Sequence, residues 1–286
     1  MYKDKTVTWK QIIIFSILAG IYTAIMCIIP AIKSTSFHDI AVTFEVWILF
    51  GILIIMHSKS AKDSALKCFV FFLISQPLVY LIQVPFSSEG LGIFRYYKYW
   101  FMMTLFTLPM GYIGYYLKKD KWYGLLILTP ILLLLGSEYY SYLRETLFHF
   151  PYHLLTSLFC IISLLLYPIF IFKNKKIKAV GTSIGIVISV VFTIMVFMNP
   201  YVYNTSILIS DDDKQIIFDD TCNIHLENEN MGKVSINYDE GIETYVVNAS
   251  FTHAGTTKLI LEDANGNQTI FNLTVDNTTY ELDKEA

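Results

Sequence analysis

Long apolar stretches separated by short polar connections run through the first 200 residues of the chain. A helix that crosses the hydrocarbon core of a bilayer, about 30 Å thick, needs roughly 20 consecutive apolar residues. Residues 125–135 are apolar except for Thr129 and Pro130, so this run lacks the polar face of a helix in a soluble bundle. The pattern predicts seven transmembrane helices, at about 11–32, 40–57, 66–86, 99–117, 122–138, 152–172 and 179–199.

The hydrophobic pattern changes after residue 200. Residues 244–251 and 271–275 alternate apolar and polar side chains, which is typical of strands with one buried face. The segment 263–267 contains Asn-Gly, which tolerates positive φ and predicts a tight hairpin. Strands are expected at 207–210, 214–218, 222–227, 233–238, 244–251, 258–262 and 268–275. Short strands at this density predict a small all-β sandwich.

The segment AGTTKLILEDANGNQTIFNLTV, residues 254–275, has a distinctive order of features. A small residue and a glycine precede a threonine-rich strand, an Asn-Gly turn and a final alternating strand. This order resembles the closing hairpin of bacterial immunoglobulin-like domains of envelope proteins. The tail has one Cys and no Trp, so it lacks the family's Cys-Trp-Cys core. The resemblance implies an Ig-like β-sandwich that serves as a spacer or adhesion module, and it covers no part of the apolar region.

Composition and charge separate the same two regions. The chain is 54% hydrophobic and 16% charged, whereas soluble domains carry roughly 25% charged residues. Residues 1–200 hold 17 Lys and Arg against 8 Asp and Glu, while residues 201–286 hold 4 against 16. We therefore expect a membrane domain over 1–200, a juxtamembrane linker over 201–206 and an extracytoplasmic β-sandwich over 207–286. The expected partner is a lipid bilayer and not nucleic acid.

The distribution of lysines predicts the orientation of the spans. With the N-terminus inside, the cytoplasmic segments hold 13 lysines, grouped at 3–10, 59–67, 118–121 and 173–178, against 4 Lys and Arg outside. The positive-inside rule therefore predicts a multi-pass plasma-membrane protein with a cytoplasmic N-terminus and an extracytoplasmic tail. Such lysine clusters can also bind anionic lipid headgroups, although a role in topology accounts for them without any ligand.

Glu45 is the most informative single residue for function. Counting inward from Asp39, it lies about 9 Å along its helix at 1.5 Å per residue. An ionisable group at the centre of a span costs about 2.5–3.5 kcal/mol to insert and is a candidate functional group. The alternative is a position close enough to the interface for the carboxylate to reach water.

Polar residues of the third span form a second candidate. Gln76, Tyr80 and Gln83 are spaced by four and three and share one helical face. Hydrogen bonding between helices is their simplest role. Gln83 is nevertheless expected at the same outer depth as Glu45, which keeps a ligand site open.

Proline and glycine positions indicate how the spans pack. Four consecutive spans contain a proline, at 77, 109, 130 and 168. Such breaks are tolerated where neighbouring groups or a cavity satisfy the freed carbonyl. In the last span, Gly181 and Gly185 form a small-xxx-small motif that predicts a close helix contact.

The expected outer loops hold the remaining candidates. Arg95 and Arg144 lie outside, against the general charge asymmetry, and arginine suits bidentate binding of a carboxylate or phosphate. His149 and His153 are four residues apart, a spacing that can chelate a metal when both lie on one helix. Pro151 between them disfavours a continuous helix, and interfacial histidines are the alternative reading.

We find no hydrolase or transferase motif, and expect neither an enzyme nor a cofactor. The leading hypothesis is an outward-facing polar pocket for a lipid-linked or amphipathic small molecule, serving transport or envelope assembly. Its candidate ligand-binding residues are Glu45, Gln76, Gln83, Arg95, Glu138 and Arg144. One alternative is a non-catalytic scaffold whose tail binds an envelope partner. Another is a membrane-embedded, metal-dependent hydrolase that uses His149, His153 and Glu138.

Overall fold

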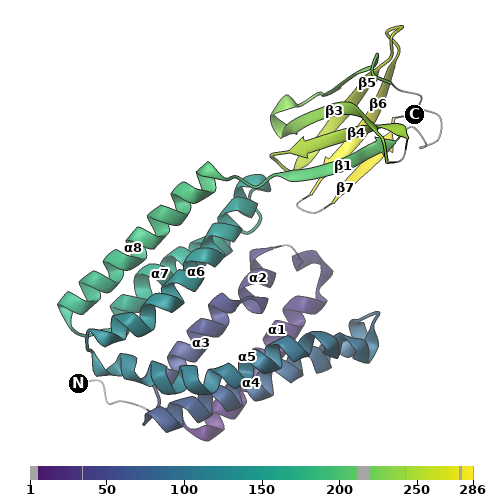
Figure 1. Cartoon of the computed structure of the whole chain (residues 1–286). Helices are drawn as coiled ribbons and strands as arrows, with labels where there is room; N and C mark the ends of the chain where they lie inside the picture. The colour runs from purple at the N-terminus through teal and green to yellow at the C-terminus, as the bar shows by residue number, and fades with distance from the viewer. Residues whose placement is uncertain (1–5, 34, 211–218, 242, 277–278, 286) are drawn as a thin grey trace. The chain divides into compact units, whose positions relative to one another are not determined.

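The computed structural model describes residues 6–33, 35–210, 219–241, 243–276 and 279–285. In these ranges, eight α-helices precede a β region of seven strands (Figure 1). The helices are α1 (Trp9–Ile28), α2 (Ser36–Val42), α3 (Phe44–Met56), α4 (Ala61–Gln83), α5 (Phe94–Gly114), α6 (Tyr123–Phe148), α7 (Leu154–Ile171) and α8 (Lys175–Met198). Contacts along the chain define a helical unit, up to Tyr142 and over His153–Ile194, and a second unit, Leu143–Tyr152 with the chain from Met195 onward.

Five helices are long and apolar enough to cross a membrane: α1, α4, α6, α7 and α8. The pair α2 and α3 meets the same test as one span bent by 46°. Side chains on the outer faces of these helices are large and apolar, and Leu18, Leu126, Phe170 and Val187 are 59–77% exposed. Apolar faces of this extent are rarely presented to water. The candidate spans imply a lipid bilayer and make the chain a candidate multi-pass membrane protein.

Two expected elements differ in the structure. Five of the seven expected spans are supported, or six when the bent pair α2–α3 is taken as one span. The remaining expected span corresponds to α5, which is 21 residues long but is not among the helices that pass the test. Its tyrosines, glycines and Pro109 make it less apolar than its neighbours. Helix α6 extends to Phe148, so Arg144 lies on a helix and not, as predicted, in a loop. No proline or glycine interrupts residues 137–150, and Leu, Glu and Arg favour helix.

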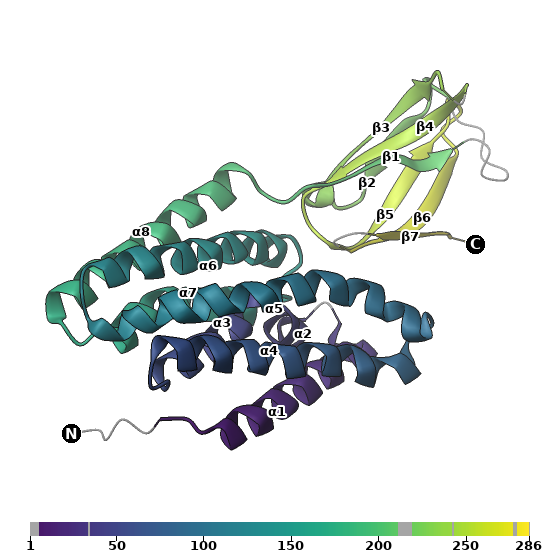
Figure 2. The same ribbon diagram turned by 60° about the horizontal axis from the view of Figure 1, so that its bottom comes forward.

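Two apolar clusters form the core of the helical unit. The first joins α1, α3 and α4 through Ile12, Trp47 and Phe71. The second joins α6, α7 and α8, and Ile52 of α3 belongs to it. Helix α3 therefore contributes to both clusters, and α1 lies against α4 (Figure 2).

Small residues and prolines occupy specific places in this packing. A Cβ added at Gly185 would lie 2.4 Å from the backbone oxygen of Leu164, and one at Gly181 would lie 2.8 Å from Pro168 Cβ. These distances confirm the predicted close contact of the last span, which is with α7. The four prolines noted in the sequence each lie within a continuous helix: Pro77 in α4, Pro109 in α5, Pro130 in α6 and Pro168 in α7.

The β region consists of two antiparallel sheets, with strand orders β1-β4-β3 and β2-β5-β6-β7. The strands are β1 (Tyr203–Ser210), β2 (Asn223–Leu226), β3 (Gly232–Asp239), β4 (Thr244–Phe251), β5 (Gly255–Glu262), β6 (Gln268–Val275) and β7 (Tyr280–Lys284). Six of the expected strands are present, and the expected strand at 214–218 lies outside the described residues. Strand β7 was not predicted, because it is short and mostly polar.

The hairpin between β5 and β6 has the predicted turn. Glu262 pairs with Gln268 across it, and Gly266 has a φ of +84°. The Asp263 carboxylate accepts hydrogen bonds from the backbone N–H groups of Asn265 and Asn267, at 2.8 and 2.9 Å. A hydrogen bond from the Asn267 side chain, together with these backbone bonds, holds the pKa of Asp263 below its ordinary value.

One hydrophobic core serves both sheets of the β region. It contains Val247 and Phe251 from the first sheet and Leu259 and Leu273 from the second. Phe148, at the end of α6, belongs to the same core and is 3% exposed. Its ring lies 4.9 Å from that of Tyr201, and its carbonyl accepts a 2.7 Å hydrogen bond from the N–H of Ala254. The second unit is thus built from the C-terminal region and the ten residues 143–152.

Candidate functional site

The break between α2 and α3 creates a polar position inside a candidate span (Figure 1). Thr43 has an extended backbone at this break, and its N–H and Oγ1 lie 2.9 and 2.6 Å from the carbonyl oxygen of Asp39. The same Oγ1 is also hydrogen-bonded to the carboxylate of Glu45. A hydroxyl carries one hydrogen to donate. The Asp39 carbonyl and the Glu45 carboxylate therefore compete for one donor.

Asp39 connects this break to the start of α7. His153 Nδ1 lies 2.6 Å from Asp39 Oδ2, and Thr156 Oγ1 donates to the same oxygen at 3.0 Å. Asp39 and His153 are 6% and 5% exposed, and Thr156 is fully buried. An ionised carboxylate only accepts hydrogen bonds and therefore pairs with an imidazole that carries its proton on Nδ1.

His153 precedes α7 with an unusual backbone conformation. Its φ is +63°, in the left-handed region, where a residue with a Cβ is strained by about 1–2 kcal/mol. His153 directly precedes the first residue of α7. Its carbonyl oxygen accepts hydrogen bonds from the N–H and the hydroxyl of Ser157, in the first turn of this helix. Backbone strain of this kind is typical of functional sites.

Glu45 lies at the centre of the site and has no solvent exposure. Cys160 Sγ, on α7, lies 3.7 Å from Glu45 Oε1, and a thiol is a weak donor. From α6, the Tyr142 hydroxyl is hydrogen-bonded to Thr43, and Glu138 is close enough to repel the Glu45 carboxylate. In the described part of the chain, Glu45 forms no ion pair with Lys or Arg. We name Asp39, Thr43, Glu45, Tyr142, His153, Thr156 and Cys160 the buried polar cluster.

Chemically, the buried polar cluster offers more acceptors than donors. Burying an ionised carboxylate costs several kcal/mol unless partners replace its hydration. Asp39 accepts from His153 and Thr156, whereas Glu45 accepts from a shared hydroxyl, a weak thiol and its own backbone N–H. The arrangement suits a group that brings donors or positive charge, such as an amine, hydroxyls or a proton.

Two of the predicted ligand-binding residues approach each other here, and the others lie elsewhere. Glu45 and Glu138 interact electrostatically. Gln83 Nε2 donates to the carbonyl of Val79 in its own helix, at 3.0 Å. Gln76 is buried on α4, and its Nε2 has no hydrogen-bond partner among the described residues.

The two arginines take part in local structure. Arg95 forms a 2.7 Å ion pair with Glu89 and lies 4.7 Å over the ring of Tyr96. Arg144 donates to the carbonyl of Pro200 at 3.0 Å and belongs to the second unit. The described contacts of both arginines are therefore with residues that are not members of the buried polar cluster.

The two histidines have different carboxylate partners. His149 Nδ1 lies 3.0 Å from Asp276 in the second unit, whereas His153 pairs with Asp39 in the helical unit. Helix α6 ends at Phe148 and α7 begins at Leu154, which confirms that no single helix carries both. In the part of the chain that the structure describes, no group of three or more His, Cys, Asp or Glu side chains could hold a metal ion.

Sequence reasoning missed most of the buried polar cluster. From the sequence, Asp39 is only the reference point for the depth of Glu45, and Thr43, Tyr142, Thr156 and Cys160 carry no signal of a site role. The available signal was a pair of acidic residues six apart, one directly before the apolar stretch 40–57 and one inside it. The partners on α7 are more than 110 residues away in the chain, so no local pattern identifies them.

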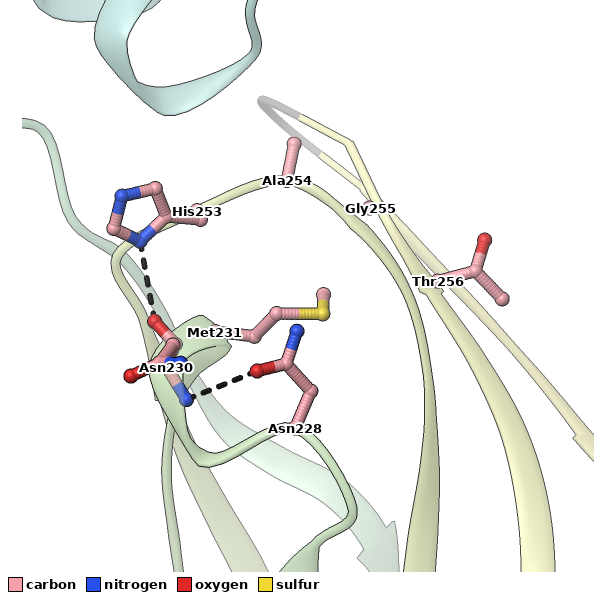
Figure 3. A pocket seen from close by; sticks show the side chains of 7 residues that line it. All are labelled: Asn228, Asn230, Met231, His253, Ala254, Gly255 and Thr256. Carbon is pink, nitrogen blue, oxygen red and sulfur yellow. Dashed lines mark hydrogen bonds between the residues drawn. The ribbon is translucent and has the colours of Figure 1, made fainter.

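Two cavities lie away from the predicted ligand-binding residues. One of about 300 Å³ in the β region is lined by Asn228, Asn230, Met231, His253, Ala254, Gly255 and Thr256. Figure 3 shows the Met231 side chain between those of His253 and Asn228. The other, of about 360 Å³, lies in the helical unit and is lined by Thr6, Ser58, Lys59, Tyr115, Lys118 and Lys119.

A scan against protein-family models and searches of the curated proteins and of the solved structures found no match for this chain.

Proposed function

We propose that the chain is an integral protein of a bacterial plasma membrane whose buried polar cluster binds a lipid-linked or amphipathic small molecule, for transport or envelope assembly. The observation that carries this proposal is the fully buried Glu45, which shares its hydroxyl donor with the carbonyl of Asp39. Ionisable groups within spans are by default candidates for function because their insertion is costly. The two buried carboxylates suit a ligand whose polar part is an amine or is rich in hydroxyls.

The proposal includes a topology of seven spans with a cytoplasmic N-terminus. It takes α5 as the further span and rests on the lysine asymmetry. In this topology the α2–α3 break and the start of α7 face outward, and the β region is an extracytoplasmic Ig-like sandwich. A tag placed after Ala286 should react with a membrane-impermeant reagent in intact cells. Labelling only after lysis would contradict this orientation.

Retention of the ligand during purification tests the binding function. Full-length protein is purified from bacterial membranes in mild detergent, and the small molecules that remain bound are quantified by mass spectrometry. We expect Glu45→Gln and Asp39→Asn to reduce the retained amphiphile at least tenfold, because each change removes negative charge from the buried polar cluster. Melting temperature and yield are measured in parallel to identify variants that fail to fold.

Glu89→Gln is the matched control for this experiment. It makes the same chemical change at a carboxylate whose described partner is Arg95, outside the buried polar cluster. We expect this variant to retain the amphiphile at the wild-type level. The proposal fails if the folded Glu45 and Asp39 variants retain the same molecules in the same amounts as this control.

The cavity of the β region favours a second candidate function, a non-catalytic scaffold whose tail binds an envelope partner. Its lining carries amides and an imidazole around an apolar Met231, a surface that can bind a polar partner. Deleting residues 205–286 should then abolish the cellular phenotype, while Glu45→Gln should leave it unchanged. The opposite pattern would support the buried polar cluster.

A further inference from the structure

The hydroxyl of Thr43 lies between two acceptor groups at the α2–α3 break. Its Oγ1 is 2.6 Å from the carbonyl oxygen of Asp39 and is also hydrogen-bonded to Oε2 of Glu45. Two oxygen atoms at hydrogen-bond distance need a hydrogen between them. The hydroxyl supplies one hydrogen, whereas the two contacts need two. The geometry therefore requires one more proton at this position.

The additional proton fits on the carboxyl group of Glu45. A protonated carboxyl group donates one hydrogen bond, and a threonine hydroxyl can accept one while it donates another. Glu45 Oε2 then donates to Thr43 Oγ1, and Thr43 Oγ1 donates to the carbonyl of Asp39. Each of the two contacts becomes a hydrogen bond, and neither acceptor faces another acceptor without a hydrogen.

The described partners of Glu45 bring no positive charge. Besides Thr43, they are the thiol of Cys160, at 3.7 Å, and the backbone N–H of Glu45 itself. The titratable groups described around Glu45 come from three helices: Asp39 of α2, Glu138 and Tyr142 of α6, and Cys160 and Tyr167 of α7. None of these side chains is a cation, and Glu138 repels a charged Glu45. Because Glu45 has no solvent exposure, an ionised carboxylate there would lose its hydration with no opposite charge beside it.

Asp39 is the contrasting carboxylate of the buried polar cluster. Its Oδ2 lies 2.6 Å from Nδ1 of His153 and accepts from Thr156 at 3.0 Å. An imidazole can carry positive charge, so Asp39 has a partner that stabilises its ionised form. An exchangeable proton therefore belongs on Glu45 and not on Asp39.

We infer that Glu45 is a proton-binding site, and that an ammonium group of the ligand displaces this proton. The site rests on the function proposed above and narrows its ligand to amphiphiles that carry an amine. In the exchange, the Oε2–H bond of Glu45 breaks and the proton passes to water. The resulting carboxylate pairs with the ammonium group, which replaces the positive charge of the proton. Each binding event releases a proton, so binding strengthens as the pH rises.

Infrared spectroscopy of the full-length protein tests the proton without any ligand. The protein is kept in a maltoside detergent, which has no carbonyl group. A protonated carboxyl group has a C=O stretching band that a carboxylate lacks. At neutral pH we expect Glu45→Gln to reduce this band by the intensity of one carboxyl group. Glu89→Gln is the matched control, because Glu89 is exposed and pairs with Arg95, and it should leave the band unchanged. Equal bands in the folded Glu45→Gln variant and in this control overturn the inference.

Calorimetry with dodecylamine tests the exchange in the wild-type protein, so it does not depend on the folding of a variant. Titrations in two buffers of different ionisation enthalpy count the protons released, and we expect about one for each amine bound. Over about pH 5–7, where an alkylamine stays charged as lysine does, binding should strengthen by up to about tenfold per unit. His153 titrates near this range, and the part of the pH dependence that Glu45→Gln removes belongs to Glu45.

Dodecanol, the uncharged analogue of the same chain length, should release no proton. The inference is overturned if dodecylamine does not bind, or if it binds without releasing a proton. The function proposed above fails separately, through unchanged retention of the native amphiphile in Glu45→Gln.

Discussion

Phe148 provides a direct test of the claim that the end of α6 is part of the β region. Its side chain is 3% exposed and belongs to the core shared by the two sheets. Replacing it with alanine removes the ring contact with Tyr201 and leaves a cavity in this core. The neighbouring Leu147 is 42% exposed, so Leu147→Ala shortens a side chain of the same helical turn without opening the core.

The expected magnitude follows from the burial of the ring. A buried Phe→Ala change costs about 3–5 kcal/mol, because the transfer free energy and the cavity both contribute. At about 0.05–0.15 kcal/mol per residue, strands β1 to β7, residues 203–284, are stabilised by about 4–12 kcal/mol. The substitution should therefore remove a large share of this stability. Leu147→Ala should change it by less than about 0.5 kcal/mol.

Hydrogen exchange of the full-length protein measures this difference. Amides of the central strands β4 and β5 exchange through opening of the whole β region. A loss of 3–5 kcal/mol accelerates their exchange by about 100-fold to several thousand-fold. Equal exchange rates in Phe148→Ala and Leu147→Ala would refute the assignment of Phe148 to this core.

Two further predictions concern the helix packing and the hairpin. Gly185→Ala should destabilise the detergent-solubilised protein by about 1–3 kcal/mol in thermal unfolding, because the new methyl group meets the backbone of Leu164. Gly51→Ala, with no heavy atom within 4 Å of its added Cβ, should not. The lowered pKa of Asp263 stabilises the hairpin above its ordinary value of 3.8, and this contribution is lost as the pH falls below that value. Asp263→Asn should therefore flatten the acid limb of the β region's stability curve.

Local patterns in the sequence predicted most of the secondary structure. The apolar stretches correspond to α1, α4, α6, α7 and α8, and the Asn-Gly turn marks the β5–β6 hairpin. The extent of α6 and the break at Thr43 were not predicted. Residues 137–150 contain no helix-breaking residue, and threonine within an apolar run gives no local signal for a 46° bend. Both features depend on neighbouring segments.

The site was less predictable than the fold because its partners are distant in sequence. Glu45 was identified because a carboxylate inside an apolar stretch is unusual. His153 was identified only for its spacing to His149, whereas its partner in the structure is Asp39, 114 residues away. The arginines were selected by charge asymmetry, and the structure shows Arg95 paired with Glu89 six residues away. Residue type identified candidates, and tertiary contacts decided their roles.

In the helical unit, the hydrogen-bond and ion-pair partners of an acidic side chain indicate whether its role is structural or whether it is a candidate functional residue. Asp63 forms an ion pair with Lys67, one turn later on the same helix. The Asp120 carboxylate accepts hydrogen bonds from the backbone N–H groups of Lys173 and Asn174, just before α8. Such contacts lie at helix ends, where water and backbone N–H groups reduce the free-energy cost of a charged side chain.

Asp39 and Glu45 differ, because both are buried and they accept hydrogen bonds from side chains of α7, of its start and of the α2–α3 break. A structural role for Glu45 would be filled better by an apolar side chain of similar volume, since a buried carboxylate rarely adds net stability. If Glu45→Leu is folded and more stable than the wild type but no longer retains the amphiphile, the carboxylate is present for binding and not for the fold.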